Sequence, residues 1–144
     1  MQITRTADYG VRLMTRLAAA PPGARMTVSE LAQESGVSSA FTGKILQRLA
    51  GARLVGSRRG FEGGFELARP ADRISVLDVV TALDGPLSLN ECLPGGGGCE
   101  REPRCAVYDV WVRAQAALAA VLGAESLDRL AAAAPEPEAA SIGE

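Results

Sequence analysis

The 144-residue sequence predicts a mostly α-helical chain with a small β-hairpin wing, organised as a winged helix-turn-helix followed by a long dimerisation helix. Three observations support this fold class. Residues 27–50 contain two short segments with helical periodicity, separated by a glycine. Residues 54–69 alternate polar and apolar side chains around a basic, glycine-rich centre. Residues 104–122 carry apolar side chains at helical spacing without interruption.

The helices expected in the first half begin at residues that favour helix starts. A first helix covers residues 8–20 and ends before a Pro-Pro-Gly sequence. A capping box of Thr27 and Glu30 opens the second helix, and Gly36 breaks it. Ser38 caps the third helix. Its apolar stripe comprises Phe41, Ile45, Leu46 and Leu49. Two short helices joined at a glycine form a helix-turn-helix pattern, which an ordinary helical hairpin shares.

The next stretch, LVGSRRGFEGGFELAR, favours the DNA-binding version of that pattern. It reads as a β-hairpin whose tip carries Arg58 and Arg59. Gly63 and Gly64 are expected to supply the positive φ angles of the turn. A helix-turn-helix followed by a hairpin with a basic tip is a winged helix. In such a fold the second helix enters the major groove of DNA, and the wing reaches the neighbouring backbone or minor groove.

Four segments are expected along the chain. Residues 1–85 form the winged helix-turn-helix, which closes with a serine-capped helix over residues 75–85. Residues 86–106 form a cysteine-rich loop, residues 104–131 a dimerisation helix with a short terminal helix, and residues 132–144 a disordered tail. The long helix has more apolar surface than a small domain needs, which favours a homodimer. Its apolar residues are Val107, Val110, Trp111, Ala114, Leu118 and Val121.

Charge is distributed unevenly along the chain. Residues 1–75 hold 11 Lys and Arg against 6 Asp and Glu, a net charge of +5. Residues 76–144 hold 4 against 11, a net charge of −7. A basic first half is compatible with a polyanionic partner such as double-stranded DNA.

The composition excludes several classes of protein. Apolar residues make up 47% of the chain and aromatic residues only 4%, so the core must be mainly aliphatic. The absence of histidine excludes histidine-based catalysis and histidine metal ligands. No apolar run is long enough to cross a membrane, and the first ten residues lack the apolar core of a secretion signal. A cytoplasmic protein is expected. No nucleophile–base pair or phosphate loop is present, so an enzyme is not expected.

All three cysteines, Cys92, Cys99 and Cys105, lie in one stretch, CLPGGGGCEREPRC. An odd number of thiols in a reducing compartment makes a structural disulfide the weaker interpretation. Thiolates are soft ligands that suit iron–sulfur clusters, zinc or copper. A glycine-rich loop can wrap a cluster and direct backbone N–H groups at its sulfides. Structural zinc sites usually contain C-x2-C pairs, which are missing here. Metal or cluster binding is therefore favoured over an unligated surface loop.

The chain resembles the IscR/NsrR/RirA-type family of winged-helix iron–sulfur transcription regulators. The matching stretches are MQITRTADYGVRLM at the start, LAQESGVSSAFTGKILQRLAGARLVGSRRGFEGGFELARPADRISVLDVVTALDG in the middle, and the three-cysteine loop before the long helix. Together they cover roughly residues 1–130 in order. The resemblance implies a homodimer that binds a double-stranded DNA operator, with a cluster near the dimer interface.

The resemblance also implies a set of cluster ligands. Cys92, Cys99 and Cys105 match the three cysteine ligands of the family, although the first spacing is one residue longer than the commonest one. Tyr108 stands where IscR has a histidine, so that fourth ligand is missing. Asp8 matches the aspartate that nitric-oxide-sensing members supply from the partner subunit, and a carboxylate is also favoured there by the helix dipole. A 4Fe–4S cluster is expected in preference to a 2Fe–2S cluster.

For DNA binding, the wing arginine of the family matches Arg59, which is expected in the minor groove with Arg58 beside it. Gly43 and Lys44 replace a glutamate and a glutamine of IscR. Lys44 suits phosphate or guanine, so the IscR operator is not expected for this chain. The residues expected on or near the exposed face of the recognition helix are Ser38, Ser39, Thr42, Lys44 and Arg48.

Two hypotheses for the function remain open on these grounds. In the first, an iron–sulfur cluster that senses nitric oxide, iron supply, oxygen or redox state sets the affinity of a dimeric regulator for its operator. In the second, a cluster-free DNA-binding regulator uses the cysteines as a thiol switch or a zinc site. Iron and sulfide content distinguishes the two.

Overall fold

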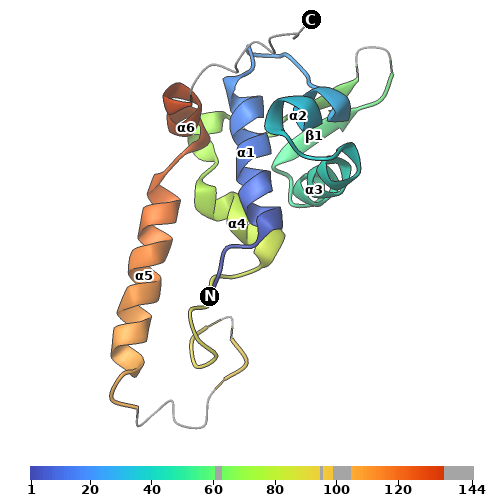
Figure 1. The fold of residues 1–144 in the computed structure, drawn as a ribbon. Coiled ribbons are helices and arrows are strands. Elements are labelled where there is room, and N and C mark those ends of the chain that lie inside the picture. The colour runs from blue at the N-terminus through green and yellow to red at the C-terminus, as the bar shows by residue number, and fades with distance from the viewer. Residues whose placement is uncertain (61–62, 95, 99–104, 135–144) are drawn as a thin grey trace, which may run out of the picture.

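The computed structural model describes residues 1–60, 63–94, 96–98 and 105–134, so most of the predicted tail, residues 135–144, lies outside it (Figure 1). The mostly helical fold class with a β-hairpin wing is confirmed. The elements are α1 (Arg5–Ala19), α2 (Val28–Ser35), α3 (Ser39–Gly51), β1 (Val55–Arg58), β2 (Gly64–Leu67), η1 (Ala71–Arg73), α4 (Val76–Asp84), α5 (Tyr108–Ala124) and α6 (Leu127–Ala133).

Capping side chains set the starts of the first helices. Thr4 accepts the N–H of Ala7 at 3.1 Å, so α1 begins at Arg5, earlier than predicted. The predicted capping box of α2 is confirmed. Thr27 accepts the N–H of Glu30 at 3.2 Å, and the Glu30 carboxylate accepts the N–H of Thr27 at 2.8 Å. Each cap satisfies an N–H group that has no partner inside its helix.

The wing is an antiparallel hairpin, as predicted, in which Val55 pairs with Leu67 and Arg58 pairs with Gly64. Its turn differs from the prediction in one respect. Gly64 has a φ of +140°, but Gly63 is not among the glycines with positive φ. Gly63 is required for a different reason, because a Cβ atom there would lie 2.5 Å from the carbonyl oxygen of Arg58. Of these two glycines, Gly64 is therefore needed for its φ angle and Gly63 for close packing.

A third backbone segment joins the hairpin to the helices. The N–H of Met26 donates to the carbonyl of Phe65 at 3.0 Å, and the N–H of Phe65 donates to the carbonyl of Met26 at 2.8 Å. A Cβ atom at Gly64 would lie 2.8 Å from the Met26 carbonyl oxygen, so glycine permits this approach. The base of the wing is thus held against the segment that precedes α2.

One aliphatic core joins α1 to α4 and the base of the hairpin. Gly10 is buried where α1 crosses α4, and a Cβ atom there would lie 2.1 Å from Cδ1 of Leu83. The missing side chain lets the two helices approach closely. The largest fully buried apolar side chains are Leu13, Met14, Leu31, Ile45, Leu46, Leu49, Leu54, Ile74, Val79, Val80 and Leu127.

The long helix α5 extends away from this body, and α6 returns to it (Figure 1). No residue of α5 is buried, whereas Leu127 of α6 is fully buried in the core. The N–H of Val76 donates to the carbonyl of Glu125, and the N–H of Leu127 donates to that of Ile74, both at 2.9 Å. The terminal helix, predicted in one segment with the long helix, therefore packs on the winged helix-turn-helix. Across the described ranges, no helix has the length and apolar character needed to cross a bilayer.

Candidate functional site

The recognition helix α3 presents its N-terminal half to solvent. Ser38, Ser39 and Lys44 are all exposed, as predicted. Ser38 is the N-cap residue and accepts the N–H of Phe41 at 3.3 Å, which places its hydroxyl at the helix start. Gln47, three residues beyond Lys44, is also exposed and was not among the predicted site residues. Helical spacing alone would have found it, because residues three apart share a face.

Thr42 does not lie on this exposed face. Its side chain is fully buried, and its hydroxyl has no hydrogen-bond partner among the described residues. The prediction that Thr42 is exposed is wrong. Thr42 lies three residues before Ile45 and four before Leu46, so it shares the face of α3 that packs into the core.

Arg48, near the C-terminal end of α3, is directed toward α4. Its guanidinium donates a hydrogen bond to the carbonyl oxygen of Leu83. Arg48 is exposed, as predicted, and the structure also gives this side chain an intramolecular partner. Any contact between Arg48 and DNA would have to compete with this hydrogen bond.

The wing carries a group of exposed arginines. Arg58 ends β1 and Arg59 follows it, and both are exposed. Residues 61–62 of the predicted tip lie outside the described residues. Arg53, which the sequence analysis did not single out, is exposed between α3 and β1 in the left-handed conformation, with a φ of +61°. These cations and Lys44 give the helix-turn-helix and its wing the positive charge that a DNA backbone requires.

The chain after α4 folds back on itself in a compact turn. The N–H of Leu93 donates to the carbonyl of Asn90 at 3.1 Å, and the N–H of Gly96 donates to that of Leu93 at 2.9 Å. The N–H of Gly98 donates to the carbonyl of Glu91 at 2.7 Å. A Cβ atom at Gly96 would lie 2.5 Å from the same Glu91 oxygen. These two glycine N–H groups are used inside the loop and are not directed at a ligand, which corrects that part of the prediction.

A glutamine on α5 holds the first part of this loop. The Oε1 atom of Gln115 accepts the N–H of Leu89 at 2.9 Å, and its Nε2 donates to the carbonyl of Pro94 at 3.5 Å. Leu93, directly after Cys92, is only 3% exposed. The backbone on both sides of Cys92 is therefore anchored, by a polar contact and by apolar burial. Nothing in the cysteine spacing indicated Gln115.

Cys92 and Cys105 are half-buried free thiols, and Cys99 lies outside the described residues. Cys105 stands in a turn just before α5, where its carbonyl accepts the N–H of Tyr108 at 3.1 Å. In the described part of the single chain, no three His, Cys, Asp or Glu side chains group closely enough to hold a metal ion. Two half-buried thiols that flank a third in sequence are nevertheless a soft donor set, which fits iron–sulfur or zinc chemistry.

Asp8 is exposed in the first turn of α1, at the position predicted to supply a carboxylate ligand. Its Oδ2 lies 3.2 Å from Nε of Arg12, one helical turn later. The two side chains are 50% and 62% exposed. Exposed pairs at this spacing contribute about 0.3–0.5 kcal/mol, so Arg12 holds the Asp8 carboxylate only weakly.

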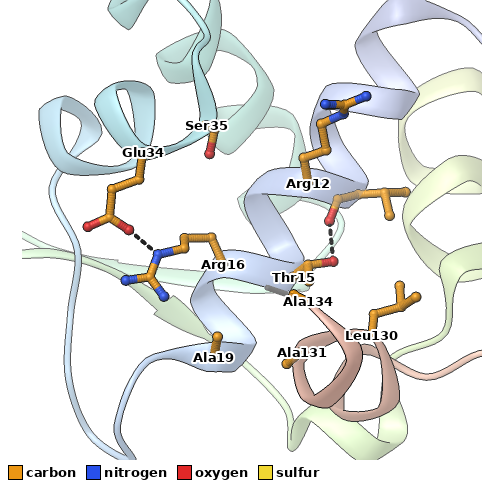
Figure 2. Close-up of a pocket in the computed structure, with 10 residues that line it drawn as sticks. Arg12, Thr15, Arg16, Ala19, Glu34, Ser35, Leu130, Ala131 and Ala134 are labelled. Carbon is orange, nitrogen blue, oxygen red and sulfur yellow. Dashed lines mark hydrogen bonds and ion pairs between the residues drawn. The ribbon is translucent and has the colours of Figure 1, made fainter. Parts of the chain in front are cut away.

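A cleft of about 680 Å³ lies between α1, α2 and α6 (Figure 2). Arg16 points toward Glu34 across it and forms an ion pair with that carboxylate. Thr15 donates its hydroxyl hydrogen to the carbonyl of Val11 at 2.8 Å. Arg16, Glu34 and Thr15 therefore have partners within the chain, and no cysteine is among the described residues that line the cleft.

Comparisons with known proteins agree with this geometry. The sequence profile of the Rrf2 family, described as "Iron-dependent Transcriptional regulator", matches residues 3–133. The chain is 39% identical over 122 residues to Rv1287 of Mycobacterium tuberculosis, a protein named for an HTH-type transcriptional regulator. That match covers 85% of this chain and 76% of the relative.

Two solved structures have the same fold. CymR of B. subtilis, named as its global cysteine regulator, is similar with a TM-score of 0.78 at 28% identity, over 94% of this chain and 99% of CymR. IscR of T. potens is similar with a TM-score of 0.75 at 25% identity, over 96% of this chain and 91% of IscR.

Proposed function

Because the chain belongs to the Rrf2 family and is a DNA-binding transcription regulator rather than an enzyme, we propose that an iron–sulfur cluster held by its cysteine loop sets its affinity for operator DNA. One observation carries this proposal. Cys92 and Cys105 are half-buried free thiols, and the backbone around Cys92 is anchored by Gln115 and by the burial of Leu93. An anchored thiol is suited to ligation, because little ordering is required when a ligand binds.

The proposed ligands are Cys92, Cys99 and Cys105 of one protomer and Asp8 of the partner subunit. The proposed group is a 4Fe–4S or a 2Fe–2S centre. When bound, it supplies iron that reacts with nitric oxide or oxygen, and its presence depends on the supply of iron. A carboxylate is a harder and weaker ligand for such iron than a thiolate. Within the described ranges, the Asp8 carboxylate is paired with Arg12, and this weak pair would have to break when Asp8 binds iron. A site with one such ligand is suited to a sensor, because small changes in nitric oxide, oxygen or iron supply change the fraction of protein that holds the cluster.

The proposed dimer forms along α5. A 17-residue helix with no buried residue is normally packed against the surface of another protein chain. Val110, Trp111, Val112 and Val121 are each at least 37% exposed on it. Because α5 also carries Gln115, which holds the loop, such a dimer would place the cysteine loop close to the interface. Two protomers are needed in any case to read two half-sites.

The proposed DNA interface combines the N-terminal half of α3 with the wing. Polar residues near the start of a recognition helix contact base edges in the major groove. Arginines at a wing tip suit the negative potential of a narrow minor groove. The exposed residues that we assign to this interface are Ser38, Ser39, Lys44, Gln47, Arg58 and Arg59. The two recognition helices of the dimer must be about one DNA turn apart, roughly 34–36 Å, so a small rotation of the protomers changes affinity.

The test is anaerobic purification, with the visible absorption spectrum and the iron and sulfide content per chain. We expect a brown protein, with about four iron and four sulfide for a 4Fe–4S centre. Asp8→Ala should lose its absorbance faster in air, whereas Asp72→Ala, which also removes an exposed carboxylate, should behave as the native protein. The purified forms are then compared for binding to an operator selected from a random duplex library. Equal affinities of the loaded and the cluster-free protein would contradict the proposal.

A cluster-free regulator remains the second candidate. It is favoured by the similarity to a protein named as a cysteine regulator and by the thiols of Cys92 and Cys105, which form no disulfide among the described residues. In that case the cysteines act as a thiol switch or hold zinc. A colourless protein with no iron, or with one zinc per chain, would select this alternative.

A further inference from the structure

The C-terminal end of α4, residues Leu83–Gly85, is where the helix-turn-helix meets the start of the cysteine loop. We refer to these three residues as the α4 joint. Gly85 ends the helix with a φ of +82°, and the chain leaves toward the loop at Pro86. From α3, Arg48 donates its guanidinium hydrogen bond to the Leu83 carbonyl. The recognition helix α3 is thus hydrogen-bonded to the end of α4, after which the cysteine loop begins.

The N-terminal end of α1 meets the same joint. Thr4 donates its backbone N–H to the Asp84 carboxylate at 3.2 Å, and its hydroxyl donates to the same carboxylate. Six residues later, Gly10 packs directly on the side chain of Leu83. Asp8, the carboxylate proposed as a cluster ligand, lies in the segment between these two contacts. In the proposed dimer, the α4 joint of each protomer therefore adjoins its own cysteine loop and, through α1, the Asp8 proposed to bind the partner's cluster.

The contact made by Arg48 has a physical reason that does not involve DNA. The last carbonyl groups of a helix have no N–H partner within it, and the helix dipole favours a cation beside them. Leu83 is the penultimate residue of α4, so its carbonyl is one of these groups. Arg48 is exposed, and its guanidinium nevertheless bonds to this carbonyl of the same chain.

We propose that Arg48 is a positioning residue, which transmits the state of the cysteine loop to the recognition helix through the α4 joint, and not a DNA contact. A displacement of the loop at Pro86 would shift the Leu83 carbonyl and, with it, the C-terminal end of α3. The regulatory part of this inference rests on the proposed function. The assignment of Arg48 as an intramolecular anchor rests on the structure alone.

The first test separates a DNA contact from an anchor by the salt dependence of operator binding. A residue that neutralises one phosphate contributes a slope of about one in log affinity against log salt concentration. Arg48→Gln should leave this slope unchanged. Lys44→Gln, which removes a cation from the exposed face of the same helix, should reduce the slope by about one. A reduction by about one in Arg48→Gln would overturn the inference.

The second test measures the ratio of operator affinities between the anaerobically loaded and the cluster-free protein. Coupling between two sites commonly amounts to a 5- to 150-fold ratio. Arg48→Gln should reduce this ratio toward one, and Asp84→Ala, which removes the Thr4 contact at an exposed position, should do the same. Lys44→Gln should weaken both forms equally and keep the ratio. A ratio retained in both Arg48→Gln and Asp84→Ala would contradict the role of the α4 joint.

The two tests also separate this inference from the proposed function. If the native protein shows no difference between its loaded and cluster-free forms, the sensor proposal fails, and the salt slope alone decides whether Arg48 is an anchor. If Arg48→Gln unfolds the protein, Arg48→Lys keeps the positive charge with a shorter reach. In Arg48→Lys, the affinity ratio should then fall toward one while the salt slope stays unchanged. If Arg48 instead contacts a phosphate, Arg48→Lys should keep both the ratio and the slope.

Discussion

The side-chain oxygen of Gln115 accepts the N–H of Leu89 at 2.9 Å and so joins α5 to the loop that carries Cys92. The two residues are 26 positions apart in the sequence. The contact links the helix proposed to form the dimer with the segment proposed to hold the cluster. A change at the dimer interface and a change in the loop are therefore expected to affect each other.

Gln115→Leu keeps the size of the side chain and removes the acceptor for Leu89. A single hydrogen bond of this kind contributes about 0.5–1.5 kcal/mol, so the loop should open more often in the cluster-free protein. We expect faster alkylation of Cys92 by N-ethylmaleimide, measured by mass spectrometry of its peptide. Gln33→Leu, at an exposed position of α2, is the matched control. Equal rates in all three proteins would show that Gln115 does not hold the loop.

Arg12→Gln releases the Asp8 carboxylate from its ion pair. Because the pair is exposed, the free energy of unfolding should fall by no more than about 0.5 kcal/mol. If Asp8 binds the cluster, removal of its competitor should slow the loss of visible absorbance in air. Arg113→Gln breaks an equivalent exposed pair with Asp109 on α5 and serves as the control for stability. Faster loss of absorbance in Arg12→Gln would contradict competition between Arg12 and iron.

Arg59→Ala tests the wing. Arg59 is exposed directly after β1, so its removal should not change the unfolding transition. Loss of one phosphate or minor-groove contact should lower operator affinity and reduce the salt slope by about one. The measurement is fluorescence anisotropy of a labelled operator at several salt concentrations. An unchanged affinity would exclude the wing tip from the interface.

Gly64→Ala tests the junction between the wing and the helices. Gly64 has a φ of +140°, and a Cβ atom would lie 2.8 Å from the Met26 carbonyl oxygen, so the backbone must move. The expected loss is about 1–3 kcal/mol in the free energy of unfolding, from urea titration. Gly56→Ala in β1 is the matched control, because a Cβ atom there meets no other atom within 4 Å. A similar small effect of both substitutions would contradict the close approach.

Trp111→Glu tests the proposed dimer. Trp111 is 37% exposed on α5, and burial of a tryptophan at an interface commonly contributes about 2–4 kcal/mol. The dimer dissociation constant should therefore rise by roughly 30- to 1,000-fold, as measured by sedimentation. Thr81→Glu adds the same charge at an exposed position of α4 and should leave the dimer intact. An unchanged dissociation constant in Trp111→Glu would place the dimer interface elsewhere.

Local spacing predicted much of the site as well as the fold. The capping box of Thr27 and Glu30, the paired strands of the wing and the exposure of Lys44 and Arg59 all follow from short-range patterns. Thr42 was placed wrongly because a polar side chain was taken as exposed, although its helical position lies on the buried face. Of the three cysteines, Cys99 lies outside the described residues, so the complete ligand set stays a prediction.

The sequence by itself determined the order of the elements, the caps of α2, α3 and α4, and the family. The caps depend on residues only a few positions apart, and the family depends on the order of such local motifs along the chain. Only the tertiary structure decided the partners of Arg48 and Gln115. Arg48 bonds to Leu83, 35 positions away in the chain, and Gln115 bonds to Leu89, 26 positions away. It also placed α6 on the core through Leu127, and left α5 without a buried residue. The physical reason is that side-chain spacing defines which face of a helix is apolar, whereas packing decides what that face and its polar ends contact.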